Sequence, residues 1–198
     1  NYNVYAIIAP AIAGQFDNVT PEQVVTGIMK LGIHQVVGAA LGADITLYHE
    51  AEEFKEKGIL TTSCCPSSVM FVEKNFPELV KYISSSPSPM ITTARMIKES
   101  DPTAKVVFIG PCSSKKVEYK LEKTGGAIDS VISFEELQAF FDARQIDMES
   151  LEETVLDNAS FYGRIFAKSG GIKEGLIAMG EKHFGIDNLN PISMSGIN

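Results

Sequence analysis

Short apolar runs of β-type residues alternate with segments of helical spacing along this chain, and the alternation restricts the fold more than any other feature. The run VYAIIAP at 4–10 has the composition of a buried strand, a helical segment follows at 21–32, and HQVVGAA at 34–40 returns to strand character. Strand, helix and strand in this order form the unit from which parallel sheets are built. The sequence therefore predicts an α/β fold with parallel pairings.

The rest of the chain continues the pattern. Helices are expected at 43–58, 66–76, 113–123, 134–146 and 169–185, and strands at 59–64, 105–112 and 127–134. Pro66 suits the first turn of its helix. The Ser/Pro stretch at 84–89 reads as a loop, and no repeat or long linker interrupts the chain. We therefore expect residues 1–198 to belong to one domain.

Charge and cysteine content exclude several classes of protein. A formal net charge of −8 and a pI near 4.9 argue against a nucleic-acid partner, which requires clustered Lys and Arg. No apolar run reaches the roughly 18 residues of a membrane span, so membrane insertion is not expected. Three cysteines, two of them adjacent, fit a reducing compartment better than a secreted disulfide framework, which predicts a cytoplasmic protein.

The three cysteines mark the predicted functional site. Cys64 and Cys65 follow one predicted strand and Cys112 follows another, and the carboxyl ends of parallel strands are where such folds bind ligands. Adjacent thiols seldom pair with each other because the disulfide is strained, so metal ligation or proton transfer is the better interpretation. Thiolates favour zinc or iron–sulfur clusters. No histidine lies at zinc-site spacing from a cysteine, which favours iron–sulfur.

Two motifs carry a resemblance to a known family. TSCCP at 62–66 and PCSSKKVE at 111–118 resemble the first and second cysteine signatures of the iron-iron (FeFe) hydrogenases. Other stretches similar to the family cover nearly the whole chain in family order, among them ADITLYHEAEE at 43–53 and IFAKSGGIKEG at 165–175. The resemblance implies a two-lobed α/β domain with parallel or mixed sheets flanked by helices. It also implies an anaerobic oxidoreductase that reversibly reduces protons to hydrogen.

The family's cofactor, the H-cluster, is a 4Fe-4S cube joined to a two-iron unit that bears CO and CN ligands. The resemblance assigns Cys65 and Cys112 as ligands of the cube, and Cys64 as the thiol that passes protons to the two-iron unit. Glu50, Ser84 and Glu53 match the family residues that relay protons between this thiol and solvent. Thiols, hydroxyls and carboxylates can each accept and donate a proton, so these residue types suit a relay. The outermost basic residue of the relay is left unassigned.

Further residues match the pocket around the irons. Lys115 matches a residue whose ammonium donates to a cyanide ligand, and Glu118, one helical turn later, is expected to be its electrostatic neighbour. The pocket wall is matched by Ala9, Pro10, Ser88, Pro89 and Phe166. Without the resemblance, the carboxylates and the lysine would be interpreted as solvated helix charges, and the serines as loop residues.

The sequence departs from the family pattern at several places. Gly110 stands where the family usually has Met, which is expected to open the pocket, and Met90 stands where a polar amide is common. The third signature, with two further cysteines that complete the cube, does not occur. We therefore expect a piece of a hydrogenase large subunit cut before that signature, and no complete cluster on this segment alone.

Three functions stay open at this point. The first is a hydrogenase catalytic domain, served by a ferredoxin-like electron donor or an N-terminal iron–sulfur domain. The second is a non-catalytic module of the same fold for redox or hydrogen sensing or for cluster assembly, which Gly110 and Met90 favour. The third is an unrelated thiol enzyme with Cys64 or Cys112 as nucleophile, which lacks a base placed beside either thiol by the sequence.

Overall fold

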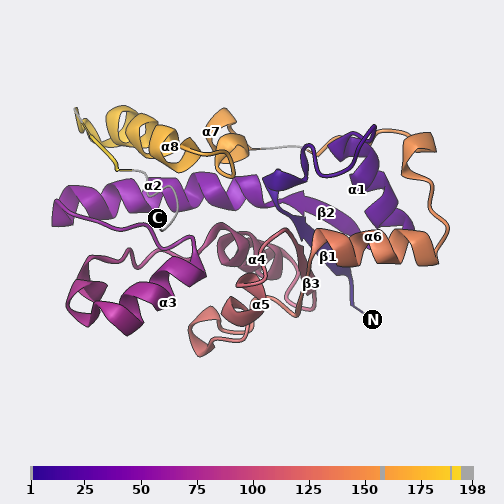
Figure 1. The fold of residues 1–198 in the computed structure, drawn as a ribbon, viewed down its shortest axis with the longest axis horizontal. Helices are drawn as coiled ribbons and strands as arrows, with labels where there is room; N and C mark the ends of the chain where they lie inside the picture. The colour runs from indigo at the N-terminus through magenta and orange to yellow at the C-terminus, as the bar shows by residue number, and fades with distance from the viewer. Residues whose placement is uncertain (1, 157–158, 188, 193–198) are drawn as a thin grey trace. The chain divides into compact units, whose positions relative to one another are not determined.

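The computed structural model describes residues 2–156, 159–187 and 189–192 and divides the chain into two compact units (Figure 1). Unit 1 comprises residues 1–39 and 93–158, and unit 2 comprises residues 40–92 and 159–198. The chain thus passes from unit 1 to unit 2, returns to unit 1 and then enters unit 2 again. The division into two units agrees with the two lobes that the resemblance implies.

Unit 1 contains a four-stranded sheet in which every pairing is parallel. Its strand order is β2-β1-β3-β4. The strands are β1 (Val4–Ile8), β2 (Gln35–Gly38), β3 (Lys105–Ile109) and β4 (Ser130–Ile132). Ile8, the last residue of β1, lies opposite Gly38 of β2 and Ile109 of β3. The carboxyl ends of the three strands therefore meet at one edge of the sheet, and the predicted parallel α/β fold is confirmed.

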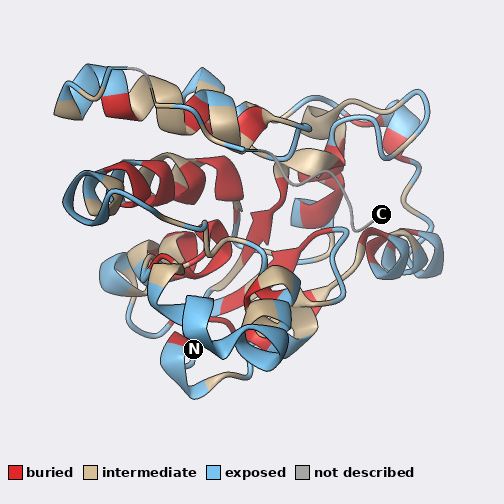
Figure 2. Cartoon of the chain, turned by 60° about the vertical axis from the view of Figure 1, so that its left-hand side comes forward, coloured by how far each residue is buried: buried red, intermediate tan, exposed pale blue. Residues whose placement is uncertain are grey.

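The strands form because their residues are apolar and largely β-branched, and they supply the core of unit 1. Ile7, Val106 and Ile109 are buried almost completely, and Figure 2 shows the strands mostly in the colour of buried residues. The sheet is accompanied by α1 (Pro21–Lys30) and α6 (Phe134–Ala143). These two helices pack closely. A Cβ atom added at Gly27 of α1 would lie only 3.2 Å from the Phe141 ring of α6.

The helix starts in unit 1 follow from capping chemistry. Thr20 and Gln23 form a capping box at the start of α1, and Ser133 and Glu136 form another at the start of α6. The helix predicted at 113–123 is shorter in the structure. The chain there forms α5 (Lys115–Glu118) and a 3₁₀ turn, Glu122–Thr124, which ends at the left-handed Gly125. Two more 3₁₀ turns are Pro10–Ile12 and Met148–Ser150.

Unit 2 is helical apart from its loops. Its elements are α2 (Ala39–Lys57), α3 (Pro66–Asn75), the 3₁₀ turn Pro77–Tyr82, the start of α4 (Pro89–Ser100), α7 (Phe161–Ile165), α8 (Gly171–Met179) and a π-helical turn, Gly180–Phe184. Helix α4 is not among the predicted helices. α8 runs beside α2 (Figure 1), and a Cβ added at Gly175 of α8 would lie 2.5 Å from Leu47 of α2. A side chain larger than that of glycine at position 175 would require the end of the Leu47 side chain to shift.

The strand predicted at 59–64 is wrong. Thr61 forms one isolated parallel bridge with Ile83, and the segment does not join the sheet. The β-branched Ile and Thr residues there do favour an extended backbone, but Ile59 is exposed and three polar residues follow Leu60, so there is little apolar surface to hold a strand. Cys64 and Cys65 therefore lie at a junction between a loop and a helix. No helix in the described ranges is both long and apolar enough to cross a membrane.

Candidate functional site

In unit 1, predicted site residues gather where β1 and β3 end. Ala9 and Pro10 follow β1, Cys112 follows β3, and the Ala9 backbone N–H donates to the Ile109 carbonyl at 2.9 Å. Cys112 is exposed, and its Sγ lies 2.8 Å from Ser114 Oγ. Cys112 thus follows a parallel strand, as the sequence predicts. An exposed thiol at a sheet edge is accessible to a metal.

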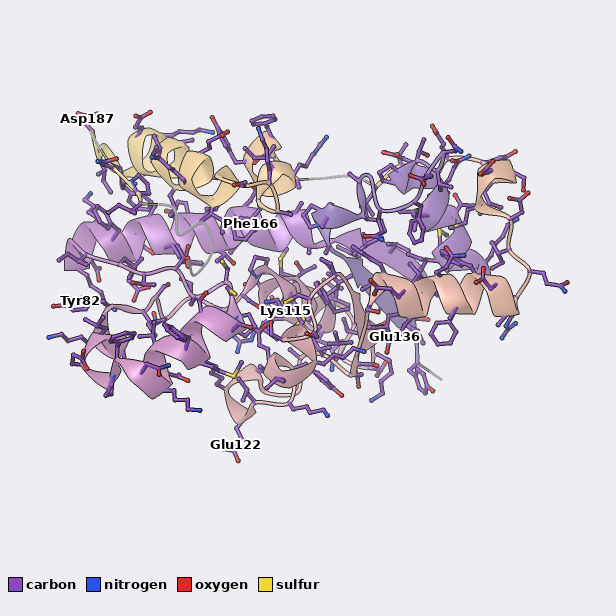
Figure 3. All side chains as sticks on the ribbon, viewed as in Figure 1. Tyr82, Lys115, Glu122, Glu136, Phe166 and Asp187 are labelled. Carbon is purple, nitrogen blue, oxygen red and sulfur yellow. The ribbon has the colours of Figure 1, made fainter. Side chains whose placement is uncertain are left out.

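Lys115 and Glu118 form an ion pair on α5, as the sequence predicts. Lys115 Nζ lies 2.6 Å from Glu118 Oε2, and the two side chains are only 12% and 9% exposed. Figure 3 labels Lys115. In such a buried setting a lone charge is costly, so each residue stabilises the charge of the other. The ion pair thereby fixes the position of Lys115 Nζ, three residues after Cys112 in the sequence.

At Gly110 the structure leaves no room for a larger side chain, and the expected opening of the pocket near the irons stays a prediction. Gly110 is buried, and a Cβ added there would lie 2.7 Å from Cε1 of Phe108 and 3.1 Å from Cβ of Ala9. Both neighbours are themselves buried. The space that a larger side chain would take at position 110 is filled by the Phe108 ring, which no pattern in the sequence indicates.

This packing makes Gly110→Ala a destabilising change. The added methyl group overlaps a ring that sits in the core, and overpacking of this kind costs about 1–3 kcal/mol. The free energy of unfolding from urea denaturation measures the loss. Phe108→Leu in the same chain should recover part of it, because it removes the ring. If Gly110→Ala alone unfolds at the wild-type urea midpoint, the close contact with Phe108 is not present in solution.

In unit 2, the loop before α3 carries the adjacent cysteines. Cys65 is the N-cap of α3 and is exposed, Cys64 is partly buried, and Pro66 is the first helical residue, as predicted. The Thr61 N–H donates to the Tyr82 carbonyl at 2.7 Å, and the Ser84 N–H donates to the Thr61 carbonyl at 2.8 Å. These two bonds attach the cysteine loop to the segment that contains Ser84.

Glu50 on α2 is the most unusual titratable group of the described residues. It is fully buried, its Oε1 accepts from the Ser63 N–H at 3.0 Å, and its Oε2 has no hydrogen-bond partner among the described residues. Burial raises the pKa of Glu50 to about 7; the Ser63 N–H opposes this rise, and the charge of Glu53 adds to it. A carboxyl group with such a pKa exchanges protons readily near neutral pH.

Glu53, one turn further along α2, connects to Ser84 and Lys57. Ser84 Oγ donates to Glu53 Oε2 at 2.7 Å, and Lys57 Nζ donates to Glu53 Oε1 at 2.6 Å. Burial raises the pKa of Glu53, but the bonds from Lys57, Ser84 and the Ser85 N–H outweigh it and hold that pKa below its ordinary value. Lys57 is thus a basic residue beside Glu53, and its spacing of four residues along one helix could have indicated the pair.

The remaining predicted pocket residues of unit 2 lie at helix ends. Ser88 and Pro89 stand at the start of α4, and Ser88 Oγ is buried with no hydrogen-bond partner among the described residues. Met90 beside them is fully buried. Phe166, labelled in Figure 3, caps α7 and is partly exposed. A buried hydroxyl without a partner is uncommon in proteins and fits a wall that a ligand would complete.

Cys65 belongs to unit 2 and Cys112 to unit 1, so a cluster held by both stays a prediction. A 4Fe-4S cube requires four thiolates, whereas the whole chain has three cysteines. Within the part of the chain that the structure describes, no three His, Cys, Asp or Glu side chains group as a metal site. Three cysteines are one fewer than the cube requires, and the absence of a complete cluster on this segment alone stays a prediction.

A family model decides the relationship. The model described as "Iron only hydrogenase large subunit, C-terminal domain" matches residues 2–197. The chain belongs to this family. The predicted fold and the predicted family are confirmed, and the chain is an FeFe hydrogenase-like domain.

Relatives of this hydrogenase-family chain include two kinds of protein. Iron hydrogenase 1 of Clostridium pasteurianum is 31% identical over 77% of the chain, and the cytosolic Fe-S cluster assembly factor NAR1 of Kluyveromyces lactis is 32% identical over 61%. The matches cover 30% and 27% of those proteins. A solved structure of an apo [FeFe]-hydrogenase HydA1 variant from Chlamydomonas reinhardtii matches 99% of the chain, with a TM-score of 0.77 and 28% sequence identity. The match covers 57% of the HydA1 chain. The chain thus spans about a third or less of these curated relatives and just over half of that structure.

Proposed function

We propose that the chain is part of a catalytic domain that reduces protons to hydrogen, with Cys64, Glu50, Ser84 and Glu53 as its proton path. The supporting observation is Glu50, a buried carboxyl group with a pKa of about 7 that is bonded to the cysteine loop. A protein that only stores a cluster has no use for such a group. The direct bond between Ser84 and Glu53 provides the next part of the path.

The proposed roles follow from where each group lies. Glu53, only 12% exposed, takes protons at the outer end, and Lys57, 40% exposed, holds it in place. Ser84 can hand a proton on because its hydroxyl donates to Glu53 and has a second lone pair to accept a proton, while the Ser86 N–H at 3.0 Å holds the oxygen in place. Glu50 carries the proton at the buried end, and the Cys64 thiol delivers it.

The metal side of the proposal rests on two thiolates. Cys65 and Cys112 would bind a 4Fe-4S cube whose other ligands come from outside these residues, and the Lys115 ammonium would donate to an anionic ligand of the two-iron unit. When bound, the cofactor supplies the redox chemistry that combines electrons and protons. By the family resemblance, Ala9 and Pro10 of unit 1 and Ser88, Pro89 and Phe166 of unit 2 would each supply part of the wall that shields it from water.

Electrons must reach the cube, so we propose a ferredoxin-like donor or an N-terminal iron–sulfur domain as partner. A cytoplasmic location stays a prediction. The relatives include a periplasmic hydrogenase subunit of Nitratidesulfovibrio vulgaris beside the cytosolic assembly factors.

A second candidate function is cluster assembly without hydrogen chemistry. It is favoured by the identity to NAR1, which is as high as the identity to the hydrogenase. Gly110 and Met90, both buried, are two positions at which this chain departs from the hydrogenase pattern. In this case Cys65 and Cys112 would bind a cluster, and the polar groups around Glu50 would have no role in catalytic proton transfer.

Hydrogen evolution by the full-length protein separates the two functions. The protein is loaded with its cluster under anaerobic conditions and supplied with a reduced viologen dye. We expect steady hydrogen production; a fully loaded protein that evolves none contradicts the proposal and supports assembly. In parallel, residues 1–198 alone should bind less than one cube per chain after reconstitution with iron and sulfide. A stoichiometric cube in that chain by iron analysis and EPR would refute the need for outside ligands.

A further inference from the structure

Ser63, which comes directly before the two cysteines, contacts two other segments of unit 2. Its backbone N–H donates to Glu50 Oε1 at 3.0 Å, and its Oγ donates to the Ser86 carbonyl at 2.6 Å. The first bond reaches α2 and the second reaches the loop between the 3₁₀ turn and α4. Ser63 therefore joins three segments of unit 2, and none of the proposed roles uses it.

Ser63 lies between the two places where backbone bonds hold the cysteine loop. On one side, Thr61 is bonded to Tyr82 and Ser84. On the other side, the Val69 N–H donates to the Cys65 carbonyl at 3.1 Å, which forms the first turn of α3. Residues 62–65 form no strand or helix, so the regular structure on either side does not determine their conformation. The two bonds of Ser63 act at the middle of this stretch, directly before Cys64.

The acceptor segment is itself held firmly. The Ser86 N–H donates to Ser84 Oγ, and Ser84 Oγ donates to Glu53. Thr46 of α2, which is buried, donates to the Pro87 carbonyl at 3.1 Å. Because Ser86 is fixed on both sides, its carbonyl gives the Ser63 hydroxyl a rigid partner. A bond to a rigid partner transfers that rigidity to the loop.

We infer that Ser63 is a positioning residue whose hydroxyl, bound to the Ser86 carbonyl, keeps its own N–H on Glu50 and so holds Cys64 next to the buried end of the proton path. The inference rests on the proposed function. One residue thereby ties together the thiol, the buried carboxyl group and the Ser84 segment. The charged group that acts on Glu50 in the structure is Glu53 of the same helix.

The test replaces the hydroxyl and observes the loop and Glu50 without any cluster. In the full-length protein purified without iron, Ser63→Ala should speed amide hydrogen exchange at the substituted residue and at Cys64 by about fivefold to tenfold, the factor that one net hydrogen bond is worth. The titration midpoint of Glu50, followed by carbon NMR, should rise, because the N–H bond that favours the charged form is made less often. Ser63→Thr keeps the hydroxyl and should restore both values.

Ser67→Ala is the matched control, since it removes an exposed serine hydroxyl four residues away on α3 and should change neither value. If Ser63→Ala does not fold, Glu50 variants test the same geometry: Glu50→Ala should speed exchange at the Ser63 amide, and Glu50→Gln, which keeps an acceptor oxygen, should not. The inference is overturned if Ser63→Ala keeps the wild-type amide exchange rates and the wild-type titration midpoint of Glu50. It is also overturned if Ser63→Thr does not restore these two values. Absence of hydrogen evolution by the wild type, with these effects present, overturns the proposed function and leaves the anchoring intact.

Discussion

Cys64→Ala is expected to leave the iron content of the full-length protein near the wild-type value while hydrogen evolution falls by about 10²-fold to 10⁴-fold. The reason is that a positioned proton donor or acceptor contributes a factor of this size. Cys64 is the partly buried thiol next to Ser63, whose N–H contacts Glu50. Water can replace an outer carboxylate more easily than this inner thiol, so Glu53→Gln should lose less.

Cys65→Ala in the same protein should lose iron and activity together. Cys65 is the exposed thiol at the N-cap of α3, and an alkyl side chain does not replace a thiolate at iron. Cys112→Ala is the matched comparison, because it removes the other proposed ligand and should behave in the same way. Iron per chain and hydrogen production are measured for all variants. Full-rate turnover by Cys64→Ala, or iron loss in Cys64→Ala but not in Cys65→Ala, would show that the roles are wrongly assigned.

Stability should fall as pH rises through the range where Glu50 ionises. In the unfolded chain its pKa is near 4.5, and in the folded protein burial raises it to about 7. The stability associated with the protonated form is therefore complete below pH 4.5 and is lost progressively up to about pH 7. This difference between the unfolded and folded pKa values of Glu50 corresponds to about 3 kcal/mol in the free energy of unfolding.

Glu50→Gln removes the ionisation and should flatten this dependence. Urea denaturation at several pH values between 4.5 and about 8 measures the free energy of unfolding for both proteins, with Glu56→Gln, an exposed change on the same helix, as control. The wild type and the control should lose stability over this range while Glu50→Gln does not. Parallel curves for all three proteins would mean that Glu50 is not buried as a neutral acid.

The strands of unit 1 could be predicted because their apolar, β-branched runs satisfy both local preference and burial in a parallel sheet. At 59–64 the same local preference was misleading, since a strand also needs neighbours to pair with, and these depend on the rest of the fold. Helix α4 was missed because it begins within the Ser/Pro stretch 84–89, which reads as a loop.

In the candidate site, too, contacts within one helix could be predicted from the sequence, whereas contacts between distant segments could not. Lys115 and Glu118 pair as their spacing along one helix predicts. Ser63 carried no signal, because one of its bonds uses the backbone N–H and the other reaches a residue 23 positions away. Phe108 filling the space at Gly110 was equally hidden, since it depends on how the end of β3 packs.

Along α2, from Glu50 to Lys57, the surroundings change from dry to wet within seven residues, or about 10 Å of helix. The inner carboxyl group sits where dissolved ions cannot reach it, whereas the ion pair of Glu53 and Lys57 lies partly in solvent, where salt weakens charge interactions. Ionic strength thus acts on one end of this helix and acidity on the other. Salt should therefore act directly at Glu53, and it should reach Glu50 only through the Glu53 charge, which contributes to the raised pKa of Glu50.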